Sequence, residues 1–122
     1  MAEQQAVFVE QARGAVVARL QCFELTSDMG DVLLQSLPGS PGAPGECKCV
    51  LDLSRLTFLG SIGLNLLVAC LKRVQRNNGA LALAGLNGHC QGVLKAVGLD
   101  RIFDIYPDVP KALDALTSPP RQ

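Results

Sequence analysis

Residues 49–64, CVLDLSRLTFLGSIGL, decide the fold, because they lead a strand-like run through a tight corner into a helix-like run. The apolar run 49–53 is typical of a buried strand, and apolar residues then recur at helical spacing from Ser61 to Gln75. Gly60, Ser61 and Gly63 occupy the corner, where glycine permits a tight backbone and close approach by another molecule. A buried strand that leads into a helix is the repeating unit of a parallel α/β sheet.

The same alternation continues toward the C-terminus. The sequence predicts a strand at 80–84, a helix at 91–97, a strand at 101–105 and a helix at 109–116. Before the corner, apolar runs at 6–10 and 15–23 predict a hairpin, and a short helix is expected between Ser27 and Pro38. The hairpin would add an antiparallel edge strand, so the fold class is α/β with a mixed sheet.

Length and composition indicate one domain, 1–122. The core must be built from Leu, Val, Ile and Ala, since Trp is absent and the aromatic residues are four Phe and one Tyr. Residues 38–46, rich in Pro and Gly, predict a flexible surface loop. The tail 117–122 is expected to fray.

The charge pattern excludes two classes of partner. Eleven basic and eleven acidic residues give a formal net charge of zero, and the absence of a basic run argues against nucleic acid and anionic membranes. The apolar segment Leu59–Cys70 is interrupted and shorter than the roughly 20 residues of a membrane span, so no direct membrane insertion is expected. The first residues lack the order of a signal peptide, and we expect a cytoplasmic protein.

Neither a metal site, a cofactor site nor an active site is expected. The five cysteines include one close pair, Cys47 and Cys49, and His89 is the single histidine, so a structural zinc site lacks ligands. The sequence holds no carboxylate pair, nucleophile elbow or phosphate loop at a credible spacing. We therefore expect a protein that is not an enzyme.

Ser61 has two interpretations. Serine is among the commonest N-cap residues, and capping alone would explain it at about 1 kcal/mol. The start of a helix also carries unpaired N–H groups and the positive end of the helix dipole, which favour a phosphate or another anion. The corner by itself leaves both interpretations open.

The helix after Ser61 has two apolar sides. One side is a normal core stripe, formed by Leu64, Leu67, Val68, Leu71 and Val74. The opposite side gathers Ile62, Leu66 and Cys70, with Ala69 and Arg73 beside them. Either a neighbouring helix covers this second side, or it is a docking surface next to Ser61.

Three ordered motifs resemble the STAS domain family, named for sulfate transporters and anti-sigma factor antagonists. The segment 50–64 resembles the family signature, in which an Asp-Leu-Ser-like strand end leads to Asp-Ser-Ser-Gly-Leu or Asp-Ser-Ala-Gly-Leu. Residues 78–86 resemble the following turn and strand, and residues 93–103 resemble a helix that closes on Gly-Leu-Asp-Lys-Leu-Phe. The resemblance implies a mixed sheet of four to five strands with helices mainly on one face.

In the anti-sigma factor antagonists of this family, the first serine of the motif is phosphorylated by a partner that is both serine kinase and anti-sigma factor. The unphosphorylated form binds that partner, and a serine phosphatase resets the switch. Carried over by position, the resemblance makes Ser61 the phosphoacceptor and the loop from Glu24 to Asp28 a neighbour on the docking surface. The expected docking residues are Glu24, Thr26, Ser27, Asp28, Gly60, Ile62, Gly63, Asn65, Leu66, Ala69 and Arg73.

The chain departs from the family pattern at two positions. Gly60 stands where the family usually has Asp, and Ile62 stands where it usually has Ser or Ala. The missing carboxylate removes a polar group that would orient the Ser61 hydroxyl or contact a kinase. This departure favours an alternative role, in which an unmodified STAS subunit is docked permanently in a signalling scaffold or a lipid-transport complex.

Overall fold

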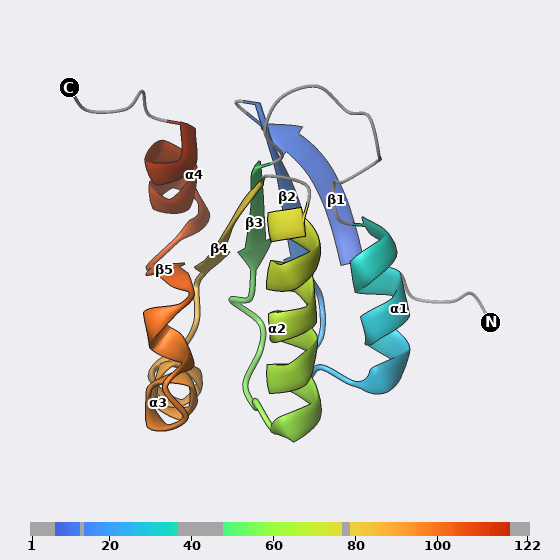
Figure 1. Cartoon of the computed structure of the whole chain (residues 1–122), viewed down its shortest axis with the longest axis vertical. Helices are drawn as coiled ribbons and strands as arrows, with labels where there is room; N and C mark the ends of the chain where they lie inside the picture. Colours follow the sequence, from blue (N-terminus) through green and yellow to red (C-terminus); the bar gives the residue numbers. More distant parts are fainter. Residues whose placement is uncertain (1–6, 13, 37–47, 77–78, 118–122) are drawn as a thin grey trace.

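A five-stranded sheet forms the centre of the computed structural model, which describes residues 7–12, 14–36, 48–76 and 79–117 (Figure 1). The strands lie in sequence order, β1-β2-β3-β4-β5. Antiparallel β1 (Val7–Ala12) and β2 (Ala15–Leu20) form the hairpin, and β3 (Lys48–Asp52), β4 (Ala80–Ala84) and β5 (Asp104–Tyr106) continue the sheet in parallel. The mixed sheet with an antiparallel edge strand is confirmed.

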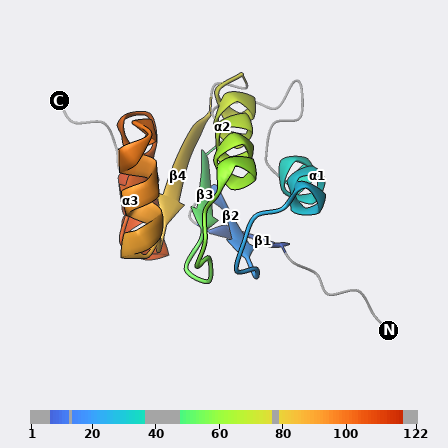
Figure 2. The ribbon, with the colours of Figure 1, turned by 90° about the horizontal axis from the view of Figure 1, so that it is seen from below.

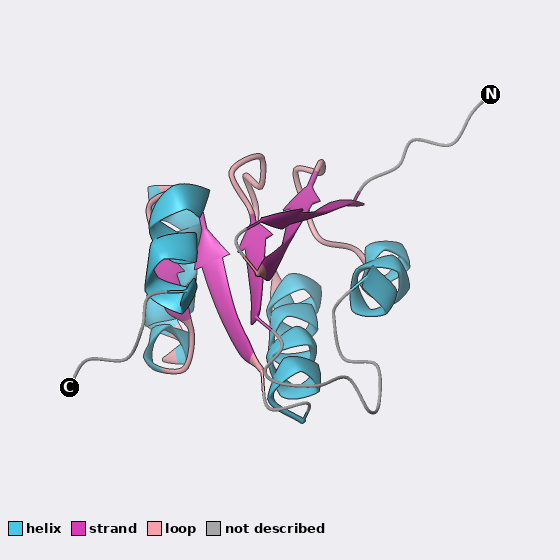
Figure 3. Cartoon of the chain, turned by 90° about the horizontal axis from the view of Figure 1, so that it is seen from above, coloured by secondary structure: helices cyan, strands magenta, loops and turns pink. Residues whose placement is uncertain are grey.

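The helices lie mainly on one face of the sheet. Helices α1 (Ser27–Ser36), α2 (Ser61–Arg76) and α3 (Gly88–Ala96) share the larger apolar core with that face, whereas α4 (Val109–Thr117) packs on the other face against β2 to β5. Helices α1 and α2 lie side by side on one side of the sheet (Figures 2 and 3). Because both faces of the central strands are covered, β3 and β4 read as almost continuous apolar runs.

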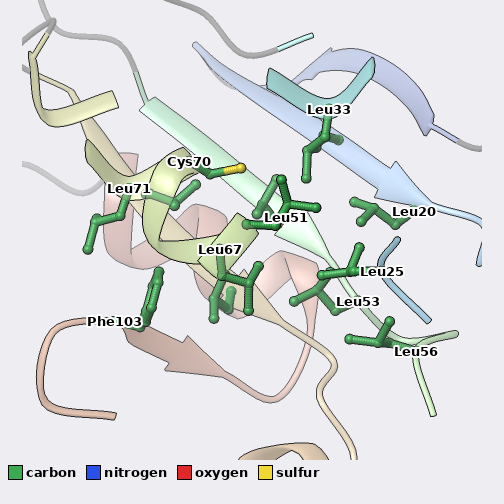
Figure 4. Packing of buried hydrophobic residues seen from close by; sticks show 14 of the residues in the cluster. Leu20, Leu25, Leu33, Leu51, Leu53, Leu56, Leu67, Cys70, Leu71 and Phe103 are labelled. Carbon is green, nitrogen blue, oxygen red and sulfur yellow. The ribbon is translucent and has the colours of Figure 1, made fainter. Parts of the chain in front are cut away.

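The larger core is built mainly from leucines. Leu51 of β3 and Leu67 of α2 are fully buried, and Leu33 of α1 points toward the same sheet face (Figure 4). The smaller core under α4 is formed by Ala15, Val17, Val50, Ala82, Ala84, Ala112 and Leu113. The small side chains of this second cluster let α4 lie close to the sheet.

Several predicted boundaries were wrong. The first strand runs to Ala12 rather than residue 10, and the second ends at Leu20 rather than residue 23. The third helix begins at Gly88 rather than residue 91, because the Asn87 side chain accepts a hydrogen bond from the Cys90 N–H at 2.8 Å and so caps it. The last strand is Asp104–Tyr106 rather than 101–105, because Gly98 adopts a left-handed conformation and starts a 3₁₀ turn, Leu99–Arg101. The predicted loop 38–46 and all but the first residue of the predicted tail lie outside the described residues.

The second apolar side of α2 is divided between the core and the surface. Helix α1 packs against α2 and buries Leu66 and Cys70, whereas Ile62 remains 55% exposed. Gly30 of α1 permits this approach, since a Cβ there would lie 3.0 Å from a Leu66 methyl group. A neighbouring helix therefore covers the middle of the stripe and leaves its first turn open.

Within the described residues, none of the helices has the length and apolar character required to cross a bilayer.

Candidate functional site

The site is built where two loops meet below the sheet. The Phe23 carbonyl, after β2, accepts hydrogen bonds from the Thr57 N–H at 2.8 Å and the Phe58 N–H at 3.1 Å. Glu24 and Phe58 also form an isolated parallel bridge. These contacts join the loop before α1 to the loop before α2, and the first turns of the two helices lie at the same end of the molecule (Figures 1 and 2).

Ser61 is the first residue of α2 rather than its cap. The Leu64 N–H donates to the Gly60 carbonyl at 2.9 Å, which puts Gly60 at the N-cap position. Ser61 is exposed, and within the described part of the chain its hydroxyl makes no hydrogen bond. The serine thus stands in the field of the helix N-terminus with a free hydroxyl, and no acidic residue in the first turn opposes an anion there.

Two shallow pockets lie beside Ser61 and meet at Ile62. The first, of about 300 Å³, contains the serine itself and is lined by Glu24, Leu25, Phe58, Gly60, Ser61, Ile62 and Gly63. The second, of about 290 Å³, lies between α1 and α2 and is lined by Thr26, Ser27, Gly30, Leu34, Ile62, Asn65, Leu66 and Ala69. We call the lining of both pockets, together with Phe23, the Ser61 surface.

Most of the residues expected at the docking surface are thus brought together. Asp28 and Arg73 line neither pocket, and Arg73 is twelve residues from Ser61, about 18 Å along the helix. Gly63 is buried, and its role is close packing, because a Cβ there would lie 2.9 Å from Leu59 Cδ1. The other expected residues lie on the Ser61 surface.

Two phenylalanines at or next to this site escaped the sequence analysis. Phe23 and Phe58 are 67% and 49% exposed, and the Phe58 ring stacks on His89 of α3 at 6.5 Å between centroids. The sequence held a signal for both residues, because each is a large apolar side chain in a loop, where such side chains often mark an interaction site. Phe58 and Ile62 line the same pocket as the serine, and the backbone of Phe23 is hydrogen-bonded to the loop that carries Phe58.

The phenylalanine ring also explains why the cap residue is glycine. A Cβ at Gly60 would lie 3.0 Å from Phe58 Cε2 and 3.3 Å from Cζ. The backbone of Gly60 is outside the left-handed region, so space rather than conformation restricts this position. Phe58 fills the place that a side chain at position 60 would take.

The cysteine environments favour a structural role. Burial raises the pKa of Cys70 to about 12, and burial also raises the pKa values of the Cys22 and Cys90 thiols. A thiol held in its neutral form is a poor nucleophile and a poor metal ligand. Within the described residues, no cluster of three or more His, Cys, Asp or Glu side chains is arranged to hold a metal ion.

Known proteins share both the sequence pattern and the fold. The STAS domain profile matches residues 8–112. BtrV of Bordetella bronchiseptica, named as a candidate anti-sigma factor antagonist, is 34% identical over 61 residues, which are 50% of this chain and 53% of the relative. The chain thus matches about half the length of that curated relative.

Two solved structures show the fold over nearly the whole chain. An anti-sigma-factor antagonist (STAS) domain protein from Planctomyces limnophilus superposes with a TM-score of 0.78 at 24% identity, covering 92% of this chain and 98% of that one. The anti-sigma factor antagonist SpoIIAA in its unphosphorylated form superposes with a TM-score of 0.69 at 17% identity, covering 95% and 100%. The profile match, the strand order and the serine at the start of α2 lead to one conclusion: the chain belongs to the STAS domain family.

Proposed function

We propose that this chain is a non-enzymatic regulator of the anti-sigma factor antagonist type, whose binding to an anti-sigma factor is switched by phosphorylation of Ser61. The observation that carries the proposal is the setting of this serine. Ser61 is exposed at a helix N-terminus, and it lies in a pocket that Phe58 and Ile62 line with exposed apolar side chains. The fold similarity to SpoIIAA, a protein with a named unphosphorylated form, supports the same proposal.

The expected mechanism follows from charge and solvation. The unmodified Ser61 surface offers Phe23, Phe58 and Ile62 to an apolar partner surface, and their burial would drive association. A phosphate on Ser61 adds about 1.5 to 2 negative charges at pH 7, which must be desolvated if the partner is to cover it. The helix N-terminus stabilises that phosphate in the free protein. Since that helix N-terminus is present in both states, it is the cost of desolvating the phosphate that makes phosphorylation favour the unbound state.

The partner would be an anti-sigma factor that also acts as a serine kinase, and a serine phosphatase would reverse the modification. The interaction itself needs no cofactor from this chain, since it consists of surface contact and release. Phosphate transfer would be the chemistry of the kinase, with Ser61 Oγ as the attacking atom.

The test compares three variants in a titration against a purified kinase-type anti-sigma factor from the same organism. Ser61→Ala should retain the wild-type affinity, and Ser61→Asp should weaken binding at least about tenfold, a loss of about 1.4 kcal/mol. Ala115→Asp is the matched control, because it adds the same charge at an exposed position of α4, on the opposite face. Equal affinity of Ser61→Ala and Ser61→Asp would refute the switch.

A second measurement addresses the modification itself. The protein isolated from its native cells should contain phosphoserine at position 61 by mass spectrometry, and Ser61→Ala protein should contain none. If wild-type protein binds the partner but is never phosphorylated, permanent docking replaces the switch.

A further inference from the structure

Within the described residues, β1 is an edge strand of the sheet. Strand β1 lies at the end of the sheet and pairs with β2 on one side. Its residues Val7–Ala12, VFVEQA, include neither the Pro nor the Lys that commonly protects an edge strand from further pairing. Phe8 and Val9 are 46% and 47% exposed. Within the part of the chain that the structure describes, the strand thus combines an unpaired edge with exposed apolar side chains on both faces.

The coverage of the sheet explains this exposure. Helix α4 packs against β2 to β5, which leaves Phe8 open on that face, and α1 reaches β1 on the other face, where it buries Val7 but not Val9. Phe8 pairs with Arg19 and Val9 pairs with Ala18 across the hairpin. Because successive side chains of a strand alternate between the two faces of the sheet, Phe8 and Val9 point to different faces at this edge.

The hairpin register indicates which backbone groups face outward. Two residues separate Ala12 from Ala15, and in such a hairpin the closing pair and every second pair after it are hydrogen-bonded. The bonded pairs then include Glu10 and Phe8, and the N–H and C=O groups of Val7, Val9 and Gln11 point away from the sheet.

This outward set is symmetric about Val9. We propose that β1 pairs antiparallel with β1 of a second copy, across a two-fold axis at Val9, so that the two sheets become continuous. Val9 then lies opposite Val9 of the other chain, Val7 opposite Gln11, and Phe8 opposite Glu10. An isologous contact of this kind needs one patch that complements itself, and the outward groups of β1 meet that requirement.

The charges are compatible with a second copy as the occupant. Glu10 bonds Arg19 of its own chain at 2.8 Å, so the axis brings no unpaired like charges together. The formal net charge of the chain is zero, and two copies do not repel each other over long range. The aliphatic part of the Glu10 side chain can lie against the exposed Phe8 ring of the other copy.

The dimer should be weak and reversible. A six-residue strand pair with two exposed apolar side chains per copy buries well below the roughly 1,600 Å² of a standard stable interface. Sedimentation of the full chain should therefore be followed from about 10 μM to about 1 mM, and the apparent mass should rise from monomer toward dimer over this range.

Charge variants of Val9 test the geometry. Val9→Lys places two ammonium groups opposite each other at the axis and should weaken dimerisation at least about tenfold, as should Val9→Glu. An equimolar mixture of the two variants should dimerise again, since each lysine then faces a glutamate. Val9→Pro removes an outward N–H without removing a bond to β2, and it should also give a monomer.

Ile102→Lys is the matched control, because Ile102 is 50% exposed next to β5, at the opposite edge of the sheet. Each variant is checked by circular dichroism, so that unfolding is not mistaken for dissociation. A wild-type chain that stays monomeric to about 1 mM overturns the proposal, as does dimerisation that survives Val9→Lys or is abolished by Ile102→Lys. Failure to restore the dimer in the Lys and Glu mixture overturns the two-fold register.

Discussion

The space at Gly60 leads to a quantitative prediction for Gly60→Asp. A carboxylate at the N-cap position of α2 should stabilise the helix by about 0.5–1 kcal/mol through capping and the helix dipole. Against this gain, its Cβ would lie 3.0 Å from Phe58 Cε2, so the ring must shift at the expense of its stack on His89. Loss of such an aromatic contact costs about 1 kcal/mol.

The stabilisation from the new cap and the loss of the aromatic contact nearly cancel in the wild-type background. Removing the Phe58 ring leaves only the stabilisation. In a Phe58→Ala background, Gly60→Asp should stabilise the chain by about 0.5–1 kcal/mol, because nothing opposes the new side chain. The double-mutant cycle should therefore give a coupling energy of about 1 kcal/mol between positions 58 and 60.

Urea unfolding followed by far-ultraviolet circular dichroism at pH 7 gives the four free energies. Gly88→Asp is the control, since it adds a carboxylate at the first position of α3, where a Cβ meets nothing within 4 Å. This control should be neutral or stabilising. A coupling energy below about 0.3 kcal/mol, the range expected of independent sites, would refute the conclusion that Phe58 determines which residue position 60 accepts.

Three further predictions concern stability. Gly85→Ala should lower the free energy of unfolding in urea by about 2–4 kcal/mol, because φ is 81° and the Cβ would lie 3.1 Å from a backbone atom of Ser54. Gly98→Ala should lower it by only about 1 kcal/mol, because φ is 82° but the Cβ would meet open space. Asp52→Asn should destabilise by about 1–2 kcal/mol and Glu10→Gln by less than about 0.5 kcal/mol, although both bind the same arginine, because their side chains are 13% and 53% exposed. Burial raises the pKa of Cys70 to about 12 from an ordinary value of 9.0, so its neutral thiol favours the folded state below pH 9. Stability measured by thermal unfolding should therefore fall from pH 9 toward pH 12. Cys70→Ala should reduce this fall, and the raised pKa values of Cys22 and Cys90 should account for part of the remainder.

Much of the fold could be predicted because local pattern and tertiary structure agree. The buried runs of β3 and β4 and the long apolar repeat of α2 specify strands and a helix without further context. The boundaries of α3 and β5 could not be placed, because each depends on the local conformation of a single residue. These residues are the Asn87 cap and the left-handed Gly98, which apolar periodicity does not report.

The candidate site was only partly predictable for a similar reason. Position along the chain places Ser61 at a helix start, but the partners of that corner come from distant segments. Phe23 reaches it through backbone hydrogen bonds, and His89 reaches it through a ring contact. Periodicity likewise identified a second apolar side of α2, and only the packing of α1 showed that Cys70 is core and Ile62 is surface.

The sequential strand order has a consequence for how the chain acquires its structure during synthesis. Since β1 to β5 lie side by side in the order in which they are translated, each strand that leaves the ribosome finds its neighbour already made. The hairpin of β1 and β2 needs only two connecting residues, whereas β3 must return to β2 across residues 21–47. The connection from β3 to β4, residues 53–79, is equally long. Closing these two segments carries the largest entropic cost among the strand pairings, and it should limit the rate of folding.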